Sequence, residues 1–158
     1  MEQTETLIFS MLEMNRNRTL AYVDNVTEQQ ADVIPKGFNN NIRWHLGHIL
    51  VAQERMAFRL IGEPLGLPDG LVSLFLNGTK PADWVTPPPD LATLRRLLEE
   101  QQGRIRERLT GRLAEPLAVP FKDLKRLDEA LLFSMTHEAN HAGFIWALKK
   151  AAAAEAGV

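Results

Sequence analysis

All four histidines of the chain lie in two short segments, residues 40–49 and 137–141. His137 and His141 are four residues apart, so on a helix their side chains project from one face about one turn apart. His48 can face that pair if its own helix packs beside theirs. Three imidazoles that converge from two helices form a transition-metal site with open positions for water or substrate. Histidines that are merely hydrogen-bonded in a core are the alternative, but this ligand spacing favours a metal.

Length and composition are those of an ordinary globular protein. The 158 residues suit one domain, residues 1–158, with a sizeable core. The hydrophobic share of 45% and the charged share of 24% are typical of such a domain. A nucleic-acid-binding protein shows a basic face, whereas this chain has a net charge of −2 and no basic cluster. We therefore expect no nucleic-acid partner.

The chain contains no cysteine, which excludes disulfides, thiolate metal ligands and a cysteine nucleophile. Residues 1–5 are acidic, where a signal peptide is basic. No apolar run approaches the roughly 20 residues that are needed to span a bilayer. These features predict a cytoplasmic protein without membrane association.

Apolar residues at three- and four-residue spacing predict long amphipathic helices. Asparagines at 39–41 and Asp90 are good N-caps, residues 27–30 resemble a capping box, and Gly62 is placed to end a helix. The long helices are expected at residues 5–23, from 39–41 to 61, 91–110 and 127–154.

Two segments between these helices are expected to be irregular. Residues 62–89 are rich in proline and glycine and form a long crossover, with one short helix within 69–76. Residues 115–123 form a proline-containing linker that need not be strand. The fold class is therefore all-α, a four-helix bundle with a long crossover between helices 2 and 3, and the core of such a bundle is a common place for metal sites.

The second long helix carries polar residues where a structural helix would carry aliphatic ones. Asn41, His48, Ala52, Arg55 and Arg59 are seven or four residues apart and share one stripe. Asn41 and Arg55 are therefore candidates for binding a substrate, and Arg55 suits an anionic group beside the metal. The alternative for Arg55 is a surface arginine at the end of the bundle.

Residues 137–141 also match H-E-x-x-H, the signature of zinc metalloproteases. The long form of that motif needs a further histidine six residues on, but position 147 is Ala147, and the only later carboxylate is Glu155. No convincing strand is visible to bind a peptide substrate. Glu138 lies about 100° round the helix from His137, so we expect it to support the site or to bridge helices rather than to act as a general base.

The segments 41–48 and 137–143 together resemble the DinB-like (DinB/YfiT) superfamily, and the resemblance extends in outline over nearly the whole chain. It implies a four-helix bundle, often a homodimer, with a divalent metal held by one histidine of helix 2 and two of helix 4. Carried over by position, these ligands are His48, His137 and His141. His45 matches an additional histidine of some relatives and is expected to support the ligands or to pack in the core.

The resemblance leaves the reaction open, because the superfamily includes thiol-dependent S-transferases, isomerases and many members without a known activity. Three functions fit the residues. The first is a metal-dependent transferase that presents the thiolate of a small anionic thiol to an electrophile. The second is a metal-dependent hydrolase, and the third is a non-catalytic bundle with a structural metal. Nickel, zinc, iron or manganese fits the ligand set.

A homodimer is expected from the same resemblance. The crossover carries apolar residues that are candidates for a contact patch between two copies. These residues are Leu71, Leu74, Phe75 and Trp84.

Overall fold

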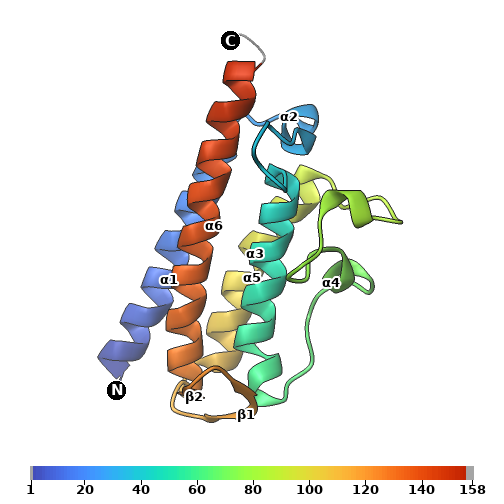
Figure 1. Cartoon of the computed structure of the whole chain (residues 1–158). Helices are drawn as coiled ribbons and strands as arrows, with labels where there is room; N and C mark the ends of the chain where they lie inside the picture. The colour runs from blue at the N-terminus through green and yellow to red at the C-terminus, as the bar shows by residue number, and fades with distance from the viewer. Residues whose placement is uncertain (1, 156–158) are drawn as a thin grey trace.

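The computed structural model describes residues 2–155 of the chain. Four long helices run side by side, and α6 packs against both α3 and α1 while α5 packs against α3 and α1 (Figure 1). This arrangement confirms the all-α four-helix bundle. The long helices are α1 (Glu2–Tyr22), α3 (Ile42–Ala57), α5 (Leu91–Leu109) and α6 (Leu127–Glu155).

The helices begin and end where local side-chain chemistry dictates. The side chain of Asn41 accepts a hydrogen bond from the backbone N–H of Trp44 at 2.8 Å, and Asp90 caps α5 in the same way through Thr93. The short α2 (Glu28–Asp32) opens with the expected capping box of Thr27.

The far end of α3 continues into a short 3-10 helix, η1 (Arg59–Ile61). Gly62 follows it with φ of 80°, a left-handed conformation that glycine adopts without steric cost. Gly62 therefore stops the helix, as its position in the sequence predicts.

The crossover between α3 and α5 packs on the outside of α3 and contains α4 (Leu71–Leu74) and η2 (Pro81–Asp83). Its apolar residues face inward: Leu71 and Phe75 are buried against the core, and Leu74 and Trp84 are partly buried against it. The expected contact patch for a second copy is therefore wrong, because these side chains are already used to hold the crossover on α3.

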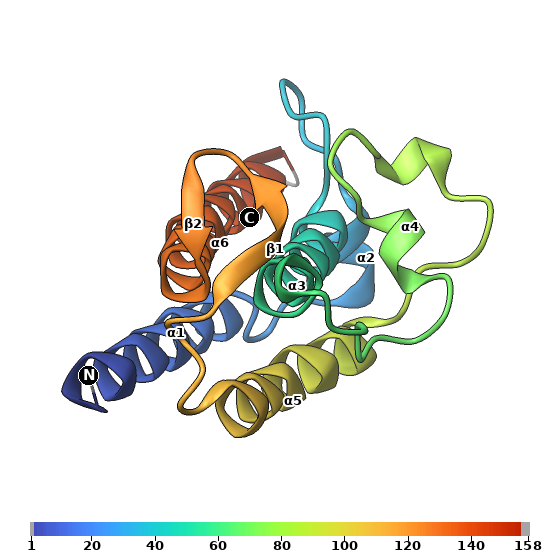
Figure 2. The same cartoon turned by 90° about the horizontal axis from the view of Figure 1, so that it is seen from below.

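A β-hairpin forms where a linker was expected. Strand β1 (Pro116–Phe121) pairs antiparallel with β2 (Leu124–Arg126), and the hairpin closes one end of the bundle across α3 and α6 (Figure 2). Its prolines are tolerated because a two-stranded sheet has two free edges. Leu117, Phe121 and Leu124 pack against α3 and α6, which stabilises strands that would not persist alone.

The bundle core contains one buried arginine that contacts all three other long helices. Arg16 of α1 is 1% exposed and forms a bidentate ion pair with Glu138 of α6, at 2.8 and 3.0 Å. The same guanidinium donates to the carbonyl of Leu98 on α5 at 2.6 Å and to Gln53 of α3 at 2.7 Å. These partners offset the cost of burying both charges.

Within residues 2–155, no helix combines the length and the apolar composition that crossing a bilayer requires.

Candidate metal centre

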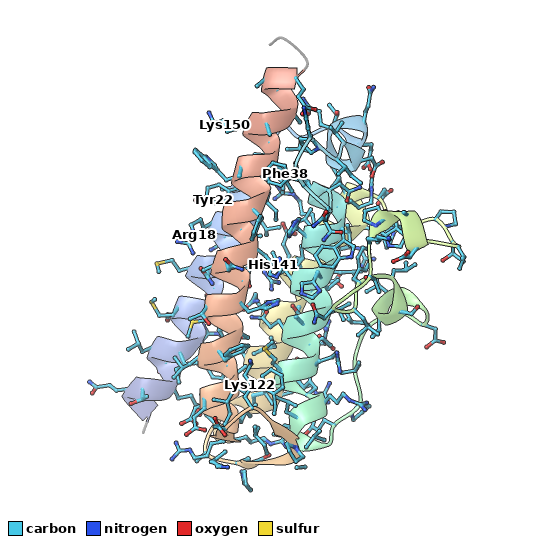
Figure 3. The ribbon with its side chains drawn as sticks, in the orientation of Figure 1. Arg18, Tyr22, Phe38, Lys122, His141 and Lys150 are labelled. Atoms are coloured by element: carbon cyan, nitrogen blue, oxygen red, sulfur yellow. The ribbon has the colours of Figure 1, made fainter. Side chains whose placement is uncertain are left out.

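His48 of α3 meets His137 and His141 of α6 halfway along the bundle. One ring nitrogen from each histidine lies within 4.8 Å of the other two. The Nε2 atoms of His48 and His137 are 3.1 Å apart. Figure 3 shows His141 between the ribbons of α6 and α3, which is where two helices can direct side chains at one point.

The ring of His48 is held on both sides. Its Nδ1 donates a hydrogen bond to the backbone carbonyl of Phe75 at 2.7 Å. Its face stacks on the indole of Trp44, with ring centres 4.6 Å apart and planes 9° apart. When Nδ1 carries the proton, Nε2 keeps its lone pair and points it at the other two histidines.

His45 supports the site from behind His141. The Nδ1 atoms of the two rings are 2.9 Å apart, so they share one hydrogen bond, and His45 also stacks on Phe144. This contact occupies Nδ1 of His141 and leaves its Nε2 for an ion. Metal-binding histidines usually have such a partner on the nitrogen that does not bind the metal.

Burial keeps all four imidazoles neutral. It lowers the pKa of His45 and of His137 to about 4 and that of His141 to about 3, and it also lowers the pKa of His48. A neutral imidazole has the lone pair that a metal requires, whereas an imidazolium does not. Two ring nitrogens 3.1 Å apart also suit a shared ion with metal–nitrogen bonds of about 2.1 Å. The three-histidine group therefore fits a divalent transition metal.

The histidines line one end of a cavity of about 530 Å³, a size that suits a small molecule. Its walls come from α3, η1, the segment after α4, the hairpin and α6. Most lining side chains are apolar, and the charged ones are all cationic. The lining residues are His48, Val51, Ala52, Arg55, Met56, Arg59, Leu60, Phe75, Leu76, Asn77, Val119, Pro120, Phe121, Lys122, Phe133, His137 and His141.

The two substrate-binding candidates have different positions. Arg55 is exposed and lines the cavity. Asn41 does not line it, because it lies two turns from His48 at the beginning of α3 and its side chain caps that helix. The stripe on α3 therefore reaches the cavity only from His48 onward.

Glu138 points away from the three histidines. Its carboxylate accepts hydrogen bonds from Arg16 and from the hydroxyl of Thr19, and the residue is 1% exposed. This position leaves it no access to a substrate in the cavity. Glu138 bridges α6 to α1, one of the two roles that the sequence suggested, and it touches the site only through its neighbour His137.

Three residues of the site were missed in the sequence. Phe75 orients His48 through its carbonyl, which no side-chain pattern reveals. Lys122 reaches the cavity from the unexpected hairpin. The contact of Trp44 with His48 could have been predicted, because the two residues are four apart and share a helix face.

Comparison with known proteins gives the following matches. The sequence model of the DinB superfamily matches residues 11–145. The crystal structure of a conserved protein from Enterococcus faecalis is similar in fold, with a TM-score of 0.67 and 12% identity over 93% of this chain and 95% of that one. No curated protein matches the sequence.

Proposed function

Because the chain belongs to the DinB superfamily, we propose that residues 1–158 form one metal-binding domain that acts as a metal-dependent S-transferase on a small anionic thiol. His48, His137 and His141 would hold one divalent transition metal ion. Nickel, zinc, iron and manganese all remain candidates, because geometry and supply decide occupancy more than affinity does.

The observation that carries this proposal is the placement of three neutral imidazoles at the end of a cavity whose charged lining residues are all cationic. Neutral ligands leave the charge of a bound divalent ion uncompensated, so the site attracts an anion. When bound, the ion would supply a Lewis acid that lowers the pKa of a thiol.

The residues around the cavity favour a thiol that comes from the substrate. The chain has no cysteine, so it cannot supply a sulfur ligand of its own. Arg55 can hold an anionic group of the same molecule by charge-assisted hydrogen bonds. The apolar walls suit an uncharged part of the same molecule. Low-molecular-weight thiols are kept reduced in the cytoplasm, where we place the protein.

A cobalt-substituted sample titrated with glutathione, bacillithiol and mycothiol tests the proposal. At least one thiol should produce a sulfur-to-metal charge-transfer band. The same titration of His137→Ala should give no band, because that variant lacks a ligand. Arg96→Gln, on an exposed arginine of α5 that pairs with Glu100, serves as the matched control and should behave as wild type.

Two other outcomes select the alternative functions. If no thiol changes the cobalt spectrum and the protein instead hydrolyses phosphate esters or amides, it is a metal-dependent hydrolase. If neither reaction occurs and metal removal only lowers stability, the metal ties α3 to α6 as a structural ion.

We also propose that the protein is a homodimer. Three apolar residues of α1 that are spaced by four and three, Leu7, Met11 and Met14, are 61%, 40% and 57% exposed. Such a stripe suits the packing of a helix from a second copy. Light scattering should give twice the chain mass, and Leu7→Glu with Met14→Glu should give a monomer. A monomeric wild type at high micromolar concentration would overturn this part of the proposal.

A further inference from the structure

Three cations line the cavity without a carboxylate partner. Within residues 2–155, Arg55, Arg59 and Lys122 form no ion pair, whereas other arginines such as Arg43 and Arg104 do. All three side chains are exposed, so they lie where the cavity opens to solvent. Unpaired cations that gather at one cavity of a chain with a net charge of −2 form a local anion-binding field.

The hairpin places Lys122 in this group. Lys122 has φ of 51°, a left-handed conformation that is uncommon for lysine. Its Nζ lies 5.2 Å from the ring centre of Phe133 on α6 and 5.9 Å from that of Phe121. These contacts place the ammonium beside two aromatic residues of the cavity lining, and Figure 3 shows Lys122 toward the hairpin end of the bundle from His141.

Helix geometry gives the distance between the cations and the histidines. Arg55 follows His48 by seven residues on α3, which is about 10 Å along the helix axis. On α6, Phe133 precedes His137 by four residues, about 6 Å, and the ammonium of Lys122 contacts the ring of Phe133. Along α3 the two ends of the cavity are therefore about 10 Å apart, the length of three extended residues.

The rest of the cavity lining includes an apolar wall. It is formed by side chains of α3, η1, the hairpin and α6. Such a wall favours an uncharged stretch of ligand. Its residues are Val51, Met56, Leu60, Val119, Phe121 and Phe133.

We propose that Arg55, Arg59 and Lys122 bind a carboxylate or phosphate at one end of an elongated ligand, and that its metal-binding head lies about 10 Å away at the three histidines. This inference rests on the proposed function, which supplies the thiol head of the ligand. It adds the chemical class of the whole ligand, an amphiphilic thiol acid with an uncharged middle. Arg55, Arg59 and Lys122 determine specificity for the anionic end.

A length series of thiol acids tests the inference on the cobalt-loaded protein. The probes are 3-mercaptopropionate, 8-mercaptooctanoate and the uncharged 8-mercaptooctanol, and the charge-transfer band reports their affinity. The long acid should bind at least tenfold more tightly than both the short acid and the long alcohol. This preference should disappear in the variant Arg55→Gln/Arg59→Gln/Lys122→Gln and persist in Arg96→Gln.

A second measurement separates this inference from the proposed function. Calorimetry measures the affinity of His137→Ala for octanoate, octyl phosphate and the neutral octanamide. This variant keeps the three cations but lacks a complete metal site. At least one anion should bind tenfold more tightly than octanamide, and the tighter anion identifies the group. Adding the three glutamine substitutions to His137→Ala should remove the difference.

The outcomes are distinct. A thiol band without any preference for the long acid overturns the inference and leaves the proposed function intact. Tight octanoate or octyl phosphate binding without any thiol band supports the cationic end and overturns the thiol proposal. Equal binding of anions and octanamide to His137→Ala also overturns the inference.

Discussion

His45 contacts the ring nitrogen of His141 that a bound ion would not use, at 2.9 Å. Removal of such a partner frees the ligand ring to rotate and lowers its basicity, which typically costs 10- to 100-fold in metal affinity. We expect His45→Ala to lose about that much affinity while it keeps its helical content by circular dichroism.

A second substitution at position 45 distinguishes a hydrogen bond to His141 from simple packing. His45→Gln places an amide near Nδ1 of His141 and should recover part of the affinity. Equal metal affinities of wild type and His45→Ala in a competition assay with a chelator would show that His45 only fills space beside Phe144.

The contact between α3 and the crossover depends on one glycine. A Cβ on Gly47 would lie 2.4 Å from the ring of Phe75, which is fully buried, and the carbonyl of Phe75 holds His48. We expect Gly47→Ala to displace this ring, to destabilise the protein by about 1–3 kcal/mol and to weaken metal binding. Urea denaturation of the metal-free protein and a chelator competition measure the two effects.

Gly103 on α5 provides a matched control, because a Cβ there meets no atom within 4 Å. Alanine in that helix interior should stabilise the protein by roughly 0.5–1 kcal/mol. If Gly47→Ala and Gly103→Ala are equally stable and bind metal equally well, the contact does not orient His48.

The long helices and the group of three histidines could be predicted because their signals are local. The caps at Asn41 and Asp90 act within one turn, and the spacing of His137 and His141 fixes a shared helix face. His48 joins this pair only when residues 40–49 and 137–141 are considered together.

The remaining features depend on contacts between distant segments. Strand β1 contains two prolines, and both strands of the hairpin are stabilised by apolar contacts with α3 and α6, so their own residues predict no strand. The buried Arg16 has partners on three other helices, and none of them is close to it in sequence. Two of the three cations that line the cavity, Arg55 and Arg59, could be predicted from their shared stripe with His48. Lys122 could not, because it lies in the hairpin.

The folded protein keeps its histidines neutral in the interior, and its stability therefore depends on pH. The pKa values of His45 and His137 are about 4 and that of His141 is about 3, below an unfolded value near 6.5. As the pH falls below 6.5, the unfolded chain binds protons that the folded chain does not. The free energy of unfolding therefore decreases toward acid.

We expect the metal-free protein to lose stability between pH 6.5 and 5. Each buried histidine contributes at most about 1.4 kcal/mol per pH unit while it is protonated in the unfolded state alone, and the partial exposure of His137 and His141 reduces their contribution. Urea denaturation at several pH values with a chelator measures the slope, and His45→Gln should reduce it. A stability that stays constant from pH 7 to 5 would contradict the neutral cluster.

The metal content of the purified protein shows directly whether the three histidines hold an ion. Wild type, His48→Ala, His141→Ala and the control Arg96→Gln would be reconstituted with a mixture of nickel, zinc, iron and manganese, separated from free ions, and measured by elemental analysis. The three-histidine site predicts about one divalent ion per chain in wild type and Arg96→Gln and close to none in either histidine variant. A wild type that retains no more metal than His48→Ala and His141→Ala would show that these histidines form no metal site.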